Sequence, residues 1–180
     1  KGEITEETDY NIGEQNRVYL NLNLGMPVAK WWNSYFNLSP FYKEFKGEIP
    51  AGKLDNSTWG MGWYTSHNFT LPKKWKVQLS SWGNVGTLDG IYTRSWLGSV
   101  DAGVSRSVLK DKLNIRLSIT DIFNTQRWRQ EVDFGNVNFN YNRKWESRSI
   151  RLQLSWKFGK TNYKQRDREL GAQDEINRIK

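Results

Sequence analysis

The sequence predicts an all-β protein, an antiparallel sheet whose strands are long enough to cross a lipid bilayer. The first observation is an unbroken alternation of apolar and polar residues over 18–26 and again over 150–158. A period of two places the apolar members of the first run on one face of a strand: Val18, Leu20, Leu22, Leu24 and Met26. Each run has about the 9–11 residues that a tilted transmembrane strand needs.

The second observation is that short and long connections alternate along the chain. Short turns are expected at 27–30, 72–74 and 110–112, and long loops at 47–56, 83–92 and 124–145. In an antiparallel sheet, this order collects the short turns at one end and the long loops at the other. That asymmetry is typical of outer-membrane barrels and is not required of a soluble sandwich.

The third observation is the position of the aromatic residues in a chain of low mean hydropathy (−0.79) with 10 Trp, 8 Tyr and 8 Phe. Trp31, Trp32 and Trp75 flank short turns. Four more tryptophans are expected towards the long loops: Trp59, Trp63, Trp82 and Trp96. Aromatic side chains with one polar edge suit the two membrane interfaces. The alternative is the core of a soluble sheet, where each buried indole N–H needs a partner.

Turn residues divide the chain into extended segments in a definite order. The first runs from 10 or 17 to 26 and ends at Pro27, and the second, 31–45, ends at a loop that contains Pro50 and Gly52. Pro72 ends the third segment, and a glycine-rich stretch ends the fourth. The expected strands after the first are 31–45, 57–71, 75–82, 95–109, 113–123 and 148–158.

Seven strands follow from this division, or eight if residues 3–11 form another. Bacterial barrels close with an even number of strands. An open edge in lipid costs several kcal/mol for each unsatisfied backbone group. We therefore expect the last part of a larger barrel, and a closed eight-stranded barrel is the alternative.

Charged residues test which face meets lipid. Those that share an apolar face fall near strand ends, where they cost about 0–1 kcal/mol rather than the 2–4 kcal/mol of the midplane: Arg106, Asp121 and Arg148. The opposite faces carry Asp101, Arg116 and Arg151. The third segment is ambiguous, because Thr65 and His67 share a face with its apolar residues.

Composition argues against several function classes. The net charge is +8, but the basic residues are spread along the chain, which argues against a nucleic-acid footprint. A chain with one His and no Cys offers no spaced nucleophile and base, and no thiolate ligands, so we expect no enzyme, cofactor or metal site. The polar start predicts that a leader was removed or that the chain begins within a longer protein. No run of about 18 apolar residues predicts a transmembrane helix.

Three stretches resemble TonB-dependent outer-membrane receptors. Residues 109–124, which end in Asp-Ile-Phe-Asn, resemble the penultimate hairpin of these receptors, 149–159 their closing strand, and 70–75 an earlier periplasmic turn. The chain is most similar to the large outer-membrane β-barrel family of Bacteroidetes. The resemblance implies a 22-stranded barrel with an N-terminal plug, of which residues 1–158 form the C-terminal strands. Residues 159–180 then form a charged, flexible periplasmic tail, which most receptors of the class lack.

The resemblance also implies a function and partners: uptake of a chelated metal, glycan or peptide across the bacterial outer membrane. The partners would be the bilayer, the rest of the barrel with its plug, and a TonB-type energy transducer. Aromatic and basic side chains of the expected external loops are the candidate ligand-binding residues: Trp82, Asp89, Tyr92, Arg127, Trp128, Arg129, Tyr141 and Trp145. Packing between loops explains the same residues equally well. The alternative functions are a small closed barrel with a structural or adhesion role and a soluble lipocalin-like binder.

Overall fold

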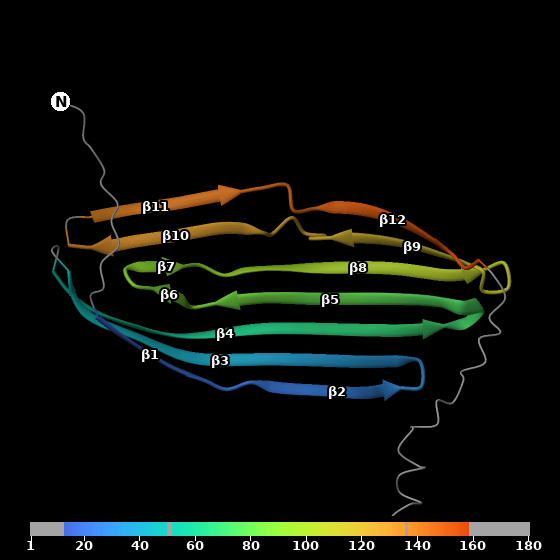
Figure 1. Cartoon of the computed structure of the whole chain (residues 1–180), viewed down its shortest axis with the longest axis horizontal. Coiled ribbons are helices and arrows are strands. Elements are labelled where there is room, and N and C mark those ends of the chain that lie inside the picture. The colour runs from blue at the N-terminus through green and yellow to red at the C-terminus, as the bar shows by residue number, and fades with distance from the viewer. Residues whose placement is uncertain (1–12, 50–51, 136, 159–180) are drawn as a thin grey trace, which may run out of the picture.

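The computed structural model describes residues 13–49, 52–135 and 137–158, and it is built of antiparallel strands (Figure 1). Eight strands form the larger sheet, in the order β1-β3-β4-β5-β8-β9-β12, with β2 pairing with β3 beside β1. Their bounds are β1 Gly13–Tyr19, β2 Leu22–Ala29, β3 Trp32–Ile49, β4 Gly52–Leu71, β5 Trp75–Val85, β8 Leu97–Val108, β9 Leu113–Thr120 and β12 Ser149–Trp156. Among the described residues, no helix is long and apolar enough to cross a membrane.

A second, four-stranded sheet continues the long hairpins and has the order β11-β10-β7-β6. Its strands are β6 Thr87–Asp89, β7 Tyr92–Arg94, β10 Arg127–Phe134 and β11 Val137–Lys144. The expected strand at 3–11 and the tail at 159–180 lie outside the described residues.

The period-two alternation predicted from the sequence is confirmed as two chemically distinct faces of the larger sheet. The pairing register aligns Val77, Val104, Leu117 and Leu152 across four neighbouring strands. One residue further along, the same strands align Gln78, Gly103, Ser118 and Arg151. We call these the apolar face and the polar face, because successive side chains of a strand point to opposite sides.

The register also assigns Thr65 and His67, which the sequence left open. His67 pairs with Ser34 and Leu79, so it lies on the apolar face. The Ser34 hydroxyl and His67 Nδ1 are 2.9 Å apart and hydrogen-bonded, and Ser34 is buried. The rings of Trp32 and Phe36 lie 6.0 and 5.5 Å from the imidazole. This hydrogen bond and the aromatic cover let two polar side chains sit on an apolar surface.

No part of the chain that the structure describes covers the apolar face. Leu24 is 54% exposed, Leu152 63% and Ile150 72%. The buried hydrophobic side chains of the described residues lie elsewhere: Phe41, Leu54, Leu88 and Val132. An apolar surface of this extent requires a non-aqueous neighbour, because soluble proteins rarely expose large contiguous apolar patches.

The two ends of the larger sheet differ as the sequence predicts. The short connections are Lys30–Trp31, the 3₁₀ turn η1 (Pro72–Lys74) and residues 109–112, and we call this the turn end, on the right in Figure 1. Aromatic side chains cluster there. The ring centroids of Trp31 and Trp32 are 6.1 Å apart, as are those of Trp156 and Phe158. At the opposite, loop end, Tyr42 and Trp59 pack on the apolar face at 5.0 Å.

The prediction that residues 47–56, 83–92 and 124–145 are loops is wrong, because strands extend into all three ranges. β3 and β4 pair without interruption from Trp32↔Phe69 to Ile49↔Gly52, and 124–145 contains β10 and β11. Glycines with positive φ lie at hairpin tips, as at Gly90 (φ 60°) and Gly135 (φ 61°), and at the junction of β5 and β6, at Gly86 (φ 70°). Turn residues at a tip therefore do not mark the whole connection as a loop.

Two strand boundaries also differ from the prediction. The first expected strand is divided at residues 20–21 into β1 and β2, and β2 continues through Pro27 with a register shift between Pro27 and Ala29. The sixth ends at Thr120, because Asp121 takes a positive φ of 47°. If β1 and β2 are counted as one, seven strands run between the two ends. Within the described residues β2 and β12 do not pair with each other, so the barrel is not closed.

Candidate functional site

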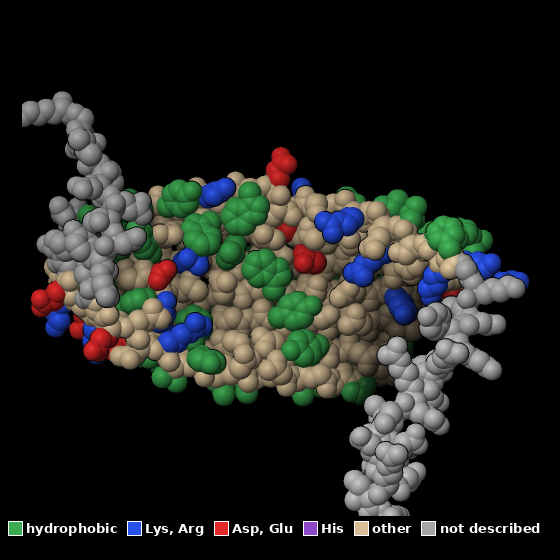
Figure 2. Space-filling model, in the orientation of Figure 1, with side chains coloured by type: hydrophobic (Ala, Val, Ile, Leu, Met, Phe, Trp, Pro, Cys, Tyr) green, Lys and Arg blue, Asp and Glu red, His purple; other side chains and the backbone are tan. Residues whose placement is uncertain are grey.

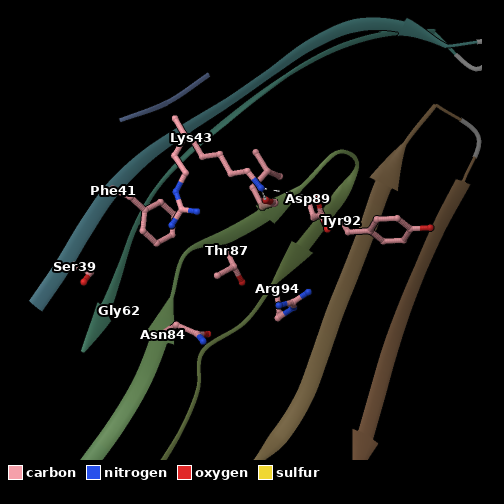
Figure 3. Close-up of a pocket in the computed structure, with 11 residues that line it drawn as sticks. Ser39, Phe41, Lys43, Gly62, Asn84, Thr87, Asp89, Tyr92 and Arg94 are labelled. Carbon is pink, nitrogen blue, oxygen red and sulfur yellow. Dashed lines mark hydrogen bonds and ion pairs between the residues drawn. The ribbon is translucent and has the colours of Figure 1, made fainter. Parts of the chain in front are cut away.

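A polar cavity of about 300 Å³ lies at the loop end, on the polar face of β3 and β4, against the β6–β7 hairpin (Figure 3). It is lined by Arg17, Ser39, Phe41, Lys43, Gly62, Asn84, Thr87, Leu88, Asp89, Tyr92 and Arg94. The pairing of Arg17 with Lys43 in β1 and β3 brings two cations to one wall. The pairing of Thr87 with Arg94 in the small hairpin places these two residues on another.

The charge of this loop-end cavity is strongly positive. It contains the cations Arg17, Lys43 and Arg94 and one carboxylate, that of Asp89. Asp89 Oδ1 is 3.9 Å from Lys43 Nζ, and the Asp89 side chain is 73% exposed. Solvent screens so exposed and distant a pair. The cavity therefore presents an uncompensated positive potential.

Lys43 lies beyond Tyr42, in the part of β3 that extends past the loop-end aromatic pair. Burial lowers the pKa of its ammonium group, Asp89 raises it, and Arg17 and Arg94 lower it, so that the pKa is below its usual value. Lys43 Nζ donates a hydrogen bond to the carbonyl oxygen of Leu88 at 2.8 Å. An anion in the cavity would raise this pKa again by stabilising the charged form.

Aromatic rings position the three cations without neutralising them. Arg17 lies 5.0 Å from the centre of the Phe41 ring, and Lys43 lies 4.5 Å from that of Phe45. Arg94 lies 3.7 Å from the centre of the Trp128 ring. Cation–π contacts of this kind stabilise a charge while leaving its N–H donors available.

Three buried polar atoms of the cavity lining have no hydrogen-bond partner among the described residues: Asn84 Oδ1, Thr87 Oγ1 and Arg94 Nε. Buried polar groups of native proteins are nearly always paired. Leaving one unpaired costs about 1–3 kcal/mol. Arg94 Nε donates, Asn84 Oδ1 accepts and the Thr87 hydroxyl can do either, so a bound molecule that carries both acceptor oxygens and a hydroxyl or N–H donor would satisfy all three.

Two of the residues predicted from the sequence, Asp89 and Tyr92, line the cavity. A third, Trp128, stacks against Arg94, which is itself a lining residue. Trp82 lies on the polar face of β5, two positions from Asn84, rather than in a loop. Tyr141 pairs with Gln130, whose side chain accepts a hydrogen bond from the Trp128 indole at 2.9 Å.

Three further predicted residues are not brought to the cavity. Arg127 and Arg129 alternate with Trp128 along β10, so they point to its opposite face. Trp145 follows the end of β11.

Sequence reasoning missed Arg17, Lys43, Asn84, Thr87 and Arg94. Arg94 could have been found from the sequence, because it follows the predicted site residue Tyr92 by two positions and so lies on the same face of a strand. Nothing in the sequence pointed to Arg17 and Lys43, because they are brought together by a strand pairing between residues 26 positions apart.

A buried carboxylate fixes the base of the β10–β11 hairpin. Asp121, fully buried just past the end of β9, accepts hydrogen bonds from the Thr125 N–H (2.8 Å), the Thr125 hydroxyl (3.0 Å) and the Gln126 N–H (3.1 Å). The Ser147 hydroxyl, from beyond β11, donates a further hydrogen bond to the carboxylate. Burial raises the pKa of the Asp121 carboxyl, but these donors outweigh it and hold the pKa below its usual value.

Asp101 extends this network on the polar face, because its Oδ1 accepts from the Asp121 N–H (2.8 Å) and the Ser99 hydroxyl (2.9 Å). The hairpin that carries Trp128 is thus tied at both of its ends to β8 and β9. Within the described part of the chain, no group of three or more His, Cys, Asp or Glu side chains could hold a metal ion.

Comparison with known proteins gives one match. The model of a family described as an outer membrane protein beta-barrel family matches residues 1–156. No curated protein and no solved structure matches the chain.

Proposed function

Because this chain belongs to the outer membrane protein β-barrel family and so lies in the bacterial outer membrane, we propose that it forms part of a receptor barrel. In this proposal the receptor takes up an anionic nutrient, and a TonB-type energy transducer drives the uptake. The loop-end cavity is the site that captures the nutrient. The uncovered apolar face is then the lipid-facing surface, and the polar face lines the lumen.

The observation that carries the proposal is the loop-end cavity with its excess of positive charge and its three unpaired polar atoms. A barrel with a purely structural role has no need to bury Arg94 Nε without a partner. Clefts of about 300–1,000 Å³ with a few convergent polar groups are typical ligand sites. The cavity lies at the end of the long hairpins, and the longer connections of outer-membrane barrels are extracellular, which supports the proposal that its ligand arrives from outside the cell.

The open edges of the sheet support the proposed partners. The outer edges of β2 and β12 have no paired strand among the described residues. In hydrocarbon, each unpaired backbone group costs several kcal/mol. We propose that further barrel strands pair with these edges, that a plug domain fills the lumen, and that the transducer acts through that plug.

Replacing Arg94 by glutamine is expected to weaken binding of anionic probes about tenfold or more. A hydrogen bond to a charged group contributes about 1.5–3 kcal/mol, and about 1.4 kcal/mol is a factor of ten. Titration calorimetry on the protein purified from outer membranes would use three probes: ferric citrate, an oligogalacturonate and an acidic peptide. The matched control is Arg129→Gln, which removes the same charge from the opposite face of β10.

Failure of all three probes, or equal losses in the two variants, would contradict the anionic ligand. Uptake by cells separates binding from transport. Dissipating the proton-motive force should abolish uptake of the probe that binds and leave its surface binding intact. Binding without energy-dependent uptake would instead favour a barrel with an adhesion role.

A further inference from the structure

The turn end of the sheet is strongly basic. The short connections and the end of β12 carry six lysines, all exposed: Lys30, Lys73, Lys74, Lys110, Lys112 and Lys157. Asp111 is the one acidic residue in these described connections, and its carboxylate pairs with Lys74 Nζ at 2.6 Å. Figure 2 shows Lys and Arg side chains gathered at this end, on the right. We call the six lysines the basic collar.

Arg106 lies just inside the basic collar and on the apolar face. It pairs with Trp75 of β5 and Ile115 of β9, both of which belong to that face. Its guanidinium is 5.1 Å from the centre of the Trp75 ring. Its Nε is buried and has no hydrogen-bond partner among the described residues.

A shallow apolar groove of about 340 Å³ begins two residues from Arg106 along β8. It is lined by Val77, Ala102, Gly103, Val104, Leu117, Ser118, Ile119 and Ile150. The small side chain of Ala102 in β8 leaves a depression on the apolar face between the larger aliphatic side chains of its paired residues, Leu79 of β5 and Ile119 of β9. The groove therefore leads from the basic end towards the middle of the lipid-facing surface.

We infer that Arg106 and this groove form a binding site for a phospholipid with an anionic headgroup. The lipid phosphate accepts hydrogen bonds from Arg106, which is stacked on Trp75 at the membrane interface. One acyl chain lies in the groove, and the lysines of the basic collar attract the headgroup. Charge complementarity selects this occupant, because the guanidinium fork suits phosphate oxygens and the groove offers only hydrocarbon contacts.

Arg106→Gln tests the headgroup contact, and native mass spectrometry of the protein purified from outer membranes, with defined lipids added, provides the measurement. We expect the unaltered protein to retain phosphatidylglycerol about fivefold or more over phosphatidylcholine, since one basic residue near an anionic headgroup contributes about that factor. Arg106→Gln should reduce the preference below twofold. Arg116→Gln is the matched control, because Arg116 pairs with Ser105 and lies on the polar face.

A second variant tests the groove without changing charge. Ala102→Leu fills the depression and should lower retention of both lipids relative to the unaltered protein. Free glycerophosphate should not displace the lipid, because it has no acyl chain for the groove. Equal losses in Arg106→Gln and Arg116→Gln would reduce the effect to general attraction by the basic collar and overturn the site. Displacement by glycerophosphate would overturn the phospholipid as its occupant.

Discussion

Replacing Asp121 by alanine is expected to destabilise the protein by about 3–5 kcal/mol, the range found when one partner of a buried charged network is removed. The fully buried carboxylate accepts four hydrogen bonds, and alanine leaves the donors of Thr125, Gln126 and Ser147 without an acceptor. These donors come from both ends of the β10–β11 hairpin, so that hairpin should detach first. Urea unfolding in detergent, followed by tryptophan fluorescence, measures the change.

The pH dependence distinguishes this network from simple packing. Because hydrogen bonds hold the Asp121 pKa below its usual value, the ionised carboxylate stabilises the folded state. That contribution is complete above the unfolded pKa, about 3.9, and is lost as the pH falls through the lower folded pKa. The difference between the two proteins should therefore be largest near neutral pH and shrink in acid.

Asp133→Ala is the matched control for Asp121→Ala, because Asp133 is an exposed aspartate on β10 of the same hairpin. Its effect should stay within about 0.5 kcal/mol, as for most surface substitutions. If both variants lose the same stability, or if the Asp121 effect does not depend on pH, the carboxylate does not tie the hairpin.

The strand faces could be predicted from sequence because alternation is a local property. The run at 18–26 keeps one face through the break between β1 and β2, since Val18 pairs with Tyr42 and Leu22 with Leu38 on the apolar face. His67 was ambiguous for a physical reason. Its polarity is compensated by Ser34, a partner 33 residues away that only the strand pairing reveals.

The loop-end cavity could not be predicted, because its parts come together through pairings between distant segments. Lys43 and Leu88 are joined by a hydrogen bond across 45 residues. The predicted residue Asp89 lines the cavity because it belongs to the same short hairpin as Arg94. Arg129 is a residue type expected in a ligand site, but its side chain lies on the opposite face of β10 from Trp128. The alternation of side chains reveals this only once residues 127–134 are known to form a strand.

Replacing Leu117 by arginine is expected to cost about 2–4 kcal/mol, the penalty for a basic side chain at the bilayer midplane. Leu117 lies in the interior of β9, on the apolar face, and is 46% exposed. In the row Val77, Val104, Leu117 and Leu152, all its cross-strand neighbours are aliphatic. Among the described residues, the cross-strand neighbours of Leu117 offer no polar group to solvate the guanidinium.

Ser118→Arg is the matched control, because Ser118 is the next residue of β9 and points to the polar face. Its arginine would join Arg116 and Arg151 towards the lumen, where water solvates it, so we expect a loss below about 1 kcal/mol. Unfolding in urea from lipid vesicles measures both variants against the unaltered protein. A larger loss for Ser118→Arg than for Leu117→Arg would show that the polar face, and not the apolar face, is the one removed from water. In that event the basic collar would not lie beside lipid headgroups either, because both assignments depend on which face of β8 and β9 meets the membrane.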